Sequence, residues 1–165
     1  MSSLPFTIRP VEDRDGGWVL SMVREWGADF VVSRGRKIFP VRLPGFCAVE
    51  LEGERLGLAT YEIINEECQM VTLHALRPHE GIGTALTAAV RDAAVAAGCR
   101  RLWLITTNDN LDALRFYQRR GFDLVVVHRD LREVARRLKP SIPLVGNFGI
   151  PIRDEIELEL RLDTP

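Results

Sequence analysis

The sequence predicts an α+β fold, with a central, mostly antiparallel sheet of about six or seven strands and helices on both faces. Three successive segments in the first half alternate apolar and polar residues and are separated by short polar turns, as in an antiparallel meander. Later segments change from this two-residue period to the 3.6-residue period of helices and back again. A meander combined with crossover helices forms a mixed sheet that is covered on both faces.

The chain begins with a predicted strand and a predicted helix. Residues 6–11 alternate like a short strand. Residues 13–30 read as one helix, because large apolar side chains such as Trp18 and Met22 recur about four positions apart. The polar run at residues 33–37 interrupts this helix.

The meander and a longer helix come next. Residues 45–52, 56–64 and 70–76 are the three predicted strands. Residues 81–97 place small and branched apolar side chains on one helical face, and Gly98 ends this helix as a C-terminal glycine.

The second half continues the alternation of strands and helices. Residues 101–106 form a strand, and residues 111–120 a helix that Gly121 ends. The remaining segments are a strand at 122–128, a helix at 131–139, a Pro/Gly-rich stretch at 140–151 and a strand at 155–162.

Composition is that of an ordinary globular chain. The 165 residues are 46% hydrophobic and 27% charged, so we expect a single domain over residues 1–165. With 22 Lys+Arg against 23 Asp+Glu the formal net charge is −1, which gives no overall attraction to nucleic acid or to an anionic membrane.

Cysteine usage and the N-terminus favour a cytoplasmic location. Cys47, Cys68 and Cys99 lack the spacing of a metal site, and we expect them to be reduced thiols packed as small apolar residues. Residues 1–7 contain neither part of a secretory signal, and no apolar run reaches the ~18 residues of a membrane span.

A glycine-rich turn is the first candidate site. A strand runs into Gly81-Ile82-Gly83-Thr84 at the start of a helix, where glycines let the backbone approach an anion and the first N–H groups point at it. The pattern predicts a phosphate cradle. Taken alone, it is equally compatible with a tight turn that binds no ligand.

A second motif lies about thirty residues later. From Asn110 to Phe122 the chain has the pattern N-x-x-A-x-x-F-Y-x-x-x-G-F. Together with the preceding G-x-G, this resembles the GNAT superfamily of N-acetyltransferases. Residues 45–128 match the core of that family, whose sheet is splayed and whose acetyl donor is acetyl-CoA.

The resemblance implies roles for individual residues. The strands at 70–76 and 101–106 would splay, so that the first pairs with pantetheine while an amide near His74 or Ala75 meets the acetyl carbonyl. Asn110 would bond pantetheine, and Tyr117 would face the sulfur. The implied cofactor-binding residues are Leu73, His74, Ala75, Leu76, His79, Glu80, Gly81, Ile82, Gly83, Thr84, Ala85, Asn110, Ala113, Phe116 and Tyr117.

One position departs from the family pattern. Three residues before the first cradle glycine the family usually has Gln or Arg, and this chain has Pro78. We expect Arg77 or His79 to supply the missing charge. Arg119 and Arg120 have two interpretations, a solvated helix face or a clamp on the 3′-phosphate of the cofactor.

Two residues are predicted to be catalytic. A phenol still holds its proton where a thiol ionises, so Tyr117 can donate a hydrogen bond to the leaving sulfur. His74 is the candidate base for the amine, with Glu62 and Asp109 as rivals. Each has an alternative interpretation: Tyr117 as a core residue, His74 as a histidine bonded within the sheet, and the run around Asp109 as a turn that caps the next helix.

The predicted function is transfer of an acetyl group from acetyl-CoA to a primary amine of a small molecule or peptide, by direct attack in a ternary complex. A non-catalytic acyl-CoA-binding module is the alternative. A Rossmann dinucleotide site is excluded because Leu86 replaces its third glycine. The insert at 129–154, with the loop at 26–37, is expected to select the acceptor; a cap on the sheet or a homodimer contact is the other interpretation of the insert.

Overall fold

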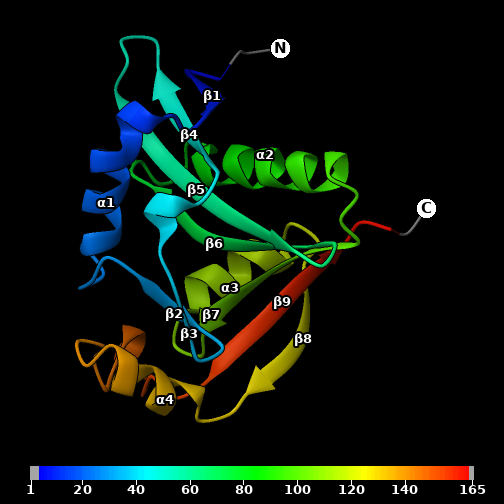
Figure 1. Cartoon of the computed structure of the whole chain (residues 1–165). Helices are drawn as coiled ribbons and strands as arrows, with labels where there is room; N and C mark the ends of the chain where they lie inside the picture. Colours follow the sequence, from blue (N-terminus) through cyan, green and yellow to red (C-terminus); the bar gives the residue numbers. More distant parts are fainter. Residues whose placement is uncertain (1–3, 164–165) are drawn as a thin grey trace.

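The computed structural model describes residues 4–163, so the first three residues of the N-terminal segment discussed above and the last two residues of the chain lie outside it. A seven-stranded sheet in the order β1-β4-β5-β6-β7-β9-β8 crosses the molecule, beside a separate hairpin of β2 and β3 (Figure 1). The strands are β1 (Phe6–Pro10), β2 (Val31–Ser33), β3 (Arg36–Ile38), β4 (Gly45–Glu50), β5 (Arg55–Ile64), β6 (Glu67–Ala75), β7 (Arg101–Thr107), β8 (Asp123–His128) and β9 (Glu155–Arg161), and the α-helices are α1 (Gly16–Arg24), α2 (Ile82–Ala96), α3 (Leu111–Gln118) and α4 (Leu131–Leu138).

The predicted mixed fold is confirmed. In the seven-stranded sheet only β6 and β7 are parallel, and every other neighbouring pair is antiparallel. α1 packs on one face, where Val19, Met22 and Val23 meet Leu58. α2 and α3 share the larger core on the opposite face (Figure 1). Between residues 4 and 163, no helix has both the length and the apolar character needed to cross a membrane.

The helix predicted over residues 13–30 is wrong in its second half. α1 ends at Arg24, and Gly27 then turns the chain with a φ of +95°. The following residues form the hairpin β2–β3, whose turn holds Arg34 and Gly35 at φ of +50° and +74°. A two-residue turn with positive φ favours glycine as its second residue, so Arg-Gly between two short strands was the signal to notice.

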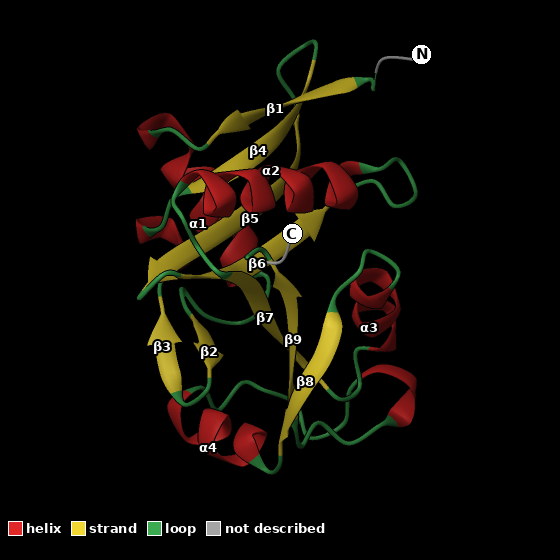
Figure 2. Ribbon diagram, turned by 90° about the vertical axis from the view of Figure 1, so that its right-hand side faces the viewer, coloured by secondary structure: helices red, strands yellow, loops and turns green. Residues whose placement is uncertain are grey.

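The other predicted elements are confirmed to within a few residues. The largest difference is β6, which begins at Glu67 and not at residue 70. Asn65 and Glu66 both have positive φ and make a tight turn that extends the pairing of β5 with β6. α4 and the hairpin β2–β3 lie together at one end of the molecule (Figure 2).

A buried carboxylate joins β1, the start of α1 and β5. Asp15 is fully buried and accepts bonds from Arg9 (2.7 and 2.9 Å), from Arg55 (2.8 Å) and from the Glu12 backbone N–H (2.8 Å). The hydrogen bond from Arg9 is the main reason that the pKa of Asp15 lies well below its ordinary value, although burial opposes the shift. Asp15 therefore stays ionised in the folded protein.

Asp15→Asn should lower the free energy of unfolding by about 2–3 kcal/mol at pH 7, because charge-assisted bonds to two arginines are lost. Since the folded-state pKa is lowered, the contribution of Asp15 is present above the unfolded-state pKa of about 4 and is lost as the pH falls below it. Urea unfolding of both proteins at pH 7 and at pH 3 measures the difference. If the two proteins differed in free energy of unfolding by the same amount at both pH values, this explanation would be contradicted.

Candidate active site

The strands β6 and β7 stay together over a short distance only. They pair through Glu67↔Arg101, Cys68↔Leu102 and Gln69↔Trp103. Beyond that point β6 remains paired with β5, and β7 with β9, up to the ends of both strands. The two strands therefore part like a V, whose open side lies opposite the tight turn between β5 and β6 (Figure 1). The splay that the resemblance implies is present.

Backbone groups of β6 face this gap. The Leu76 N–H donates to the Leu56 carbonyl on the β5 side (2.8 Å). Because N–H direction alternates along a strand, the His74 N–H also points toward β5, and those of Leu73 and Ala75 point into the gap. The predicted amide contact to an acetyl carbonyl thus fits Ala75 better than His74.

The start of α2 is open to an anion. Gly81 precedes the helix with a φ of +80°, and no side chain caps it. The first N–H that bonds back is that of Ala85, to the Gly81 carbonyl (3.0 Å). The N–H groups of Ile82, Gly83 and Thr84 bond to no residue between 4 and 163, and the first turn holds no acidic residue. This is the arrangement that binds phosphates at helix N-termini.

A cavity of about 560 Å³ lies against this helix start. Asp112 is the single carboxylate among the described side chains that line it. The cations exceed it in number, so the cavity suits the phosphates of a nucleotide cofactor. The arginines that line it are Arg77, Arg115, Arg119 and Arg120.

Two of these arginines have defined partners. Arg77 pairs with Glu50 (2.9 Å) and Glu54 (3.0 Å), so its charge is already matched. Arg120 donates to the Thr84 hydroxyl (2.9 and 2.6 Å) and lies 3.5 Å above the Phe116 ring. It is therefore not a freely solvated side chain, because it ties the end of α3 to the first turn of α2.

The two cradle glycines serve different purposes. Gly81 has open space around it, and its positive φ is what requires glycine. A Cβ at Gly83 would lie 3.2 Å from the end of the Phe116 ring. Gly83 thus lets α2 and α3 pack closely, in addition to the predicted approach of backbone to phosphate.

A second cavity, of about 660 Å³, occupies the gap between β6 and β7. Tyr117 and Asn110 of α3 lie on its border. Its walls come from the loop after α1, from β2, and from the insert between β8 and β9, as well as from the two parting strands. The lining residues are 25–27, 31–33, 69–73, 104–107, 110, 113, 117, 132, 139, 141–143 and 152.

The Tyr117 side chain is buried and borders this cavity. It is 8% exposed and packs edge-on against Phe116 and Phe122, with ring centroids 5.1 and 5.3 Å away. Burial raises the pKa of its phenol above the ordinary value, and Arg120 opposes the shift. Tyr117 therefore holds its proton at physiological pH and can act as a hydrogen-bond donor.

Asn110 caps α3 and borders the larger cavity, while its bond to pantetheine stays a prediction. Its side-chain oxygen accepts the Ala113 N–H (3.2 Å) and so caps α3. It also borders the larger cavity, where the amide NH₂ remains as a donor.

His74 does not line either cavity. Its ring stacks on Trp26, with centroids 4.2 Å apart, and it is 8% exposed. Burial lowers its pKa to about 4, and the nearby Met22 backbone opposes this shift although neither ring nitrogen has a partner at hydrogen-bonding geometry. His74 is thus neutral at physiological pH, and the side chain that lines the cavity at this point is that of Trp26.

The rival bases are also engaged elsewhere. Glu62 pairs with Arg36 of β3 (2.6 Å). Asp109 is 2% exposed and accepts bonds from the Thr107 hydroxyl (2.5 Å) and from Asn147 (2.9 and 3.1 Å). Asp109 therefore fixes the insert, a role that the sequence did not reveal.

Asn108 anchors the C-terminal end of the insert. Its side-chain oxygen accepts the backbone N–H groups of Arg153 and Asp154 (both 3.0 Å), and its amide donates to the Pro151 carbonyl (2.9 Å). The polar run after β7 thus caps α3 and also anchors the segment that forms one wall of the larger cavity.

The sequence model of the Acetyltransferase (GNAT) family matches residues 19–122 of this chain. The chain belongs to this family. The protein YdhI of Bacillus subtilis (strain 168), itself uncharacterized, is 45% identical over 135 residues, which is 81% of this chain and 83% of that protein. The resemblance seen in the two motifs is therefore confirmed.

Solved structures share the fold at low sequence identity. An IAA acetyltransferase from Bacillus cereus ATCC 14579 superposes with a TM-score of 0.71 at 18% identity, over 95% of this chain and 99% of that one. A GNAT family acetyltransferase from Elizabethkingia anophelis with acetyl-CoA bound has a TM-score of 0.69 at 17% identity, over 97% and 100% of the two chains. The GNAT-like fold prediction is confirmed.

The variant Thr84→Glu tests phosphate binding at the start of α2 without lowering the stability of the fold. A carboxylate in the first turn of α2 favours the helix, so the free energy of unfolding should stay the same or rise by up to about 1 kcal/mol. The same charge repels a pyrophosphate, so the dissociation constant of acetyl-CoA should rise at least tenfold. Calorimetric titration measures the affinity and thermal unfolding the stability, with Thr84→Ser as the neutral control. Unchanged affinity for acetyl-CoA would place the phosphates elsewhere.

Proposed function

We propose that this acetyltransferase moves the acetyl group of acetyl-CoA to a primary amine by direct attack in a ternary complex. The observation that carries the proposal is the larger cavity, which joins the gap between β6 and β7 and has Tyr117 on its border. An acetyl group entering along the gap would meet both a hydrogen-bond donor and space for a second molecule.

The donor side of the site fits acetyl-CoA. The N–H groups at the start of α2 and the arginine-lined cavity beside them suit its phosphates. The open edge of β6 and the amide of Asn110 suit the amide groups of pantetheine. What acetyl-CoA supplies is an acetyl group activated as a thioester.

Tyr117 assists the departure of the sulfur. Negative charge develops on the sulfur as the thioester breaks, and a buried donor stabilises such charge more strongly than water does. Because burial raises the pKa of the phenol, complete proton transfer to a thiolate with an ordinary pKa near 8.5 is uphill. Tyr117 therefore acts mainly as a hydrogen-bond donor.

The amine must lose a proton without an obvious strong base. An alkyl amine with a pKa near 10 costs about 4 kcal/mol to deprotonate at pH 7, and one near 8 about 1 kcal/mol. Glu25 is the one carboxylate among the described side chains that line the cavity, and it is exposed. Base catalysis by His74 stays a prediction and requires Trp26 to move aside.

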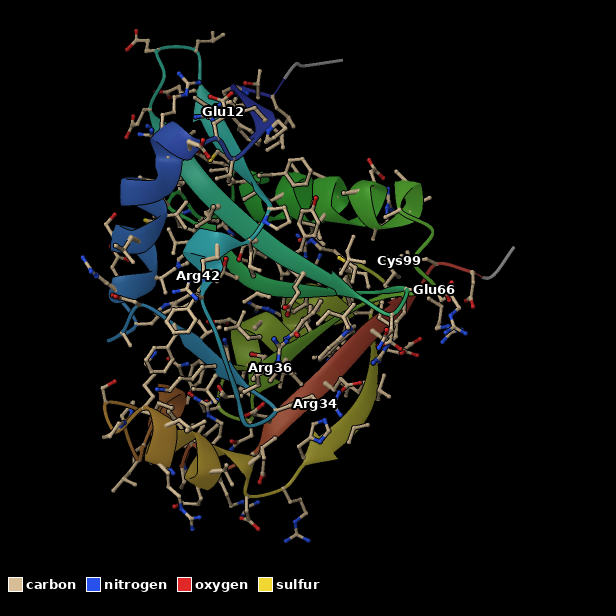
Figure 3. All side chains as sticks on the ribbon, viewed as in Figure 1. Glu12, Arg34, Arg36, Arg42, Glu66 and Cys99 are labelled. Atoms are coloured by element: carbon tan, nitrogen blue, oxygen red, sulfur yellow. The ribbon has the colours of Figure 1, made fainter. Side chains whose placement is uncertain are left out.

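The cysteines favour direct attack over an acyl-enzyme. Cys47, Cys68 and Cys99 are free and buried, and none lines either cavity. Burial raises the pKa of the Cys47 and Cys68 thiols to about 11 and 12, which suppresses the reactive thiolate. Cys99 lies near Glu66, at the end of the molecule where β6 and β7 are still paired (Figure 3).

Tyr117→Phe should lower kcat about ten- to a thousandfold and leave the dissociation constant of acetyl-CoA within about twofold, because the lost bond matters when the sulfur becomes anionic. Thiol release with a panel of amines measures kcat, and Tyr61→Phe, the other tyrosine, is the matched control. A wild-type rate in Tyr117→Phe would make Tyr117 a packing residue. Tight acetyl-CoA binding with no thiol release by wild type against any amine would support the non-catalytic alternative.

The insert selects the acceptor in this proposal. It contributes Arg132, Lys139, residues 141–143 and Ile152 to the larger cavity, and none of its residues lines the cavity at the start of α2. A change in its placement should therefore affect the acceptor and spare the donor.

Asn108→Ala removes three side-chain hydrogen bonds to the end of the insert. The acceptor KM should rise about tenfold or more, since a misplaced wall weakens positioning, while the acetyl-CoA affinity stays unchanged. Steady-state kinetics and calorimetry measure the two quantities, with Gln118→Ala, an exposed amide outside both cavities, as the control. Equal losses for donor and acceptor would contradict a selective role of the insert.

A homodimer and a cytoplasmic location remain predictions. β8 is an edge strand of the sheet, and its Leu124 and Val127 are 54% and 57% exposed. This edge is the surface that a second copy would cover.

A further inference from the structure

We infer that Lys139 binds a carboxylate of the acceptor, so that the preferred acceptors are small amines that carry a carboxylate, as amino acids do. This inference rests on the proposed acetyl transfer to an amine. It names the chemical class of substrate that fits the larger cavity.

Lys139 is placed to contact a ligand there. It follows the last turn of α4, is 7% exposed and lines the larger cavity. Its Cε lies 3.9 Å from the position that a Cβ on Gly27 would take. The side chain thus reaches from the insert to the loop after α1, across one end of the cavity.

Lys139 has no counter-charge within the protein. Its side chain makes no ion pair and no hydrogen bond with any residue from 4 to 163. A partly desolvated ammonium without an anionic partner is costly, and both burial of the side chain and the neighbouring Arg132 lower its pKa. An anion brought by a ligand would remove this cost.

Arg132 lies in the same wall, but its charge has a partner within the protein. Its Nη1 bonds the Glu155 carboxylate (3.2 Å) and the Val32 carbonyl (3.3 Å), while its Nε is buried without a partner. Glu155 is fully buried and also accepts a hydrogen bond from the Arg34 N–H (2.9 Å). Its negative charge is therefore balanced by Arg132 and does not pair with Lys139. Lys139 is the cation left unmatched.

The balance of charge along the cavity favours an anionic acceptor. The charge of Arg132 is matched by the buried Glu155. Glu25 also lines the cavity, but it is exposed to solvent, whereas Lys139 is 7% exposed and has no ion pair. Polycationic amines would meet repulsion here and no carboxylate pair to hold them. The ammonium of Lys139 can donate up to three hydrogen bonds, so it can bind a carboxylate oxygen of the acceptor and match its charge.

Matched acceptors test the inference. Thiol release is measured for L-amino acids, for their amides and for the amines left after decarboxylation, with phosphoethanolamine as an anion of a different kind. The acids should have a kcat/KM at least tenfold above the amides and the decarboxylated amines, because a charge-assisted bond to a buried lysine is lost in the latter two.

Lys139→Met should lower kcat/KM for the acids about 10- to 100-fold through KM, leave the amides unchanged and keep the acetyl-CoA affinity. Lys139→Arg should recover part of the loss. Arg91→Met, at an exposed cation of α2 that lines neither cavity, is the control.

Three results would overturn the inference: no preference for the acids, a Lys139→Met effect of equal size on acids and amides, or a Lys139-dependent preference for phosphoethanolamine. A loss in Lys139→Met that appears in kcat and not in KM would mean that Lys139 takes part in proton transfer from the amine, and not in binding the carboxylate. If no amine releases thiol, the proposed function fails separately. Calorimetric titration of the amino acids into the CoA complex, in wild type and Lys139→Met, then still decides whether Lys139 binds the carboxylate.

Discussion

The parting of β6 and β7 is the constraint on which the site depends. The two strands share three residue pairs and then separate, while each remains paired on its other side. Backbone N–H and C=O groups need partners, so an open inner edge is costly unless water or a ligand occupies it. A ligand rich in amide groups can pair with this edge as a further strand would, and the cavity between the strands leaves room for it.

α2 and α3 contribute different groups to the site beside this gap. The first turn of α2 presents free N–H groups and is bordered by arginines, which suits phosphates. α3 presents Tyr117 from a buried, aromatic setting, which suits charge that develops during the reaction. Arg120 joins the two helices through Thr84 and the Phe116 ring, so the phosphate end and the reacting end are held at a fixed separation.

The opposite wall is built from segments distant in sequence. Glu155 at the start of β9 binds the turn of the hairpin β2–β3 and Arg132 of α4. Asn108 and Asp109 bind the end of the insert. Glu155 and Asp109 are buried carboxylates with several bonds each, and Asn108 makes three side-chain bonds to the insert. The wall therefore has a defined shape, in which Lys139 lines the cavity.

Local sequence patterns predicted the meander, the glycine cradle, the helix that carries Asn110 and Tyr117, and the order of all elements except the hairpin β2–β3. Each of these follows from local periodicity or from a motif of about a dozen residues. Such short patterns can be interpreted because they reflect backbone geometry and the residue preferences of turns. The surroundings of several site residues depend instead on contacts made after folding. Trp26 continues the helical spacing of α1 but instead covers His74, since Gly27 turns the chain, and Asp109 bonds the insert rather than a substrate. Lys139 reads in sequence as the end of a polar helix, and its burial depends on the loop around Gly27, more than a hundred residues away. Such contacts join segments that no local pattern connects, so burial and counter-charge could be known only once the chain was folded.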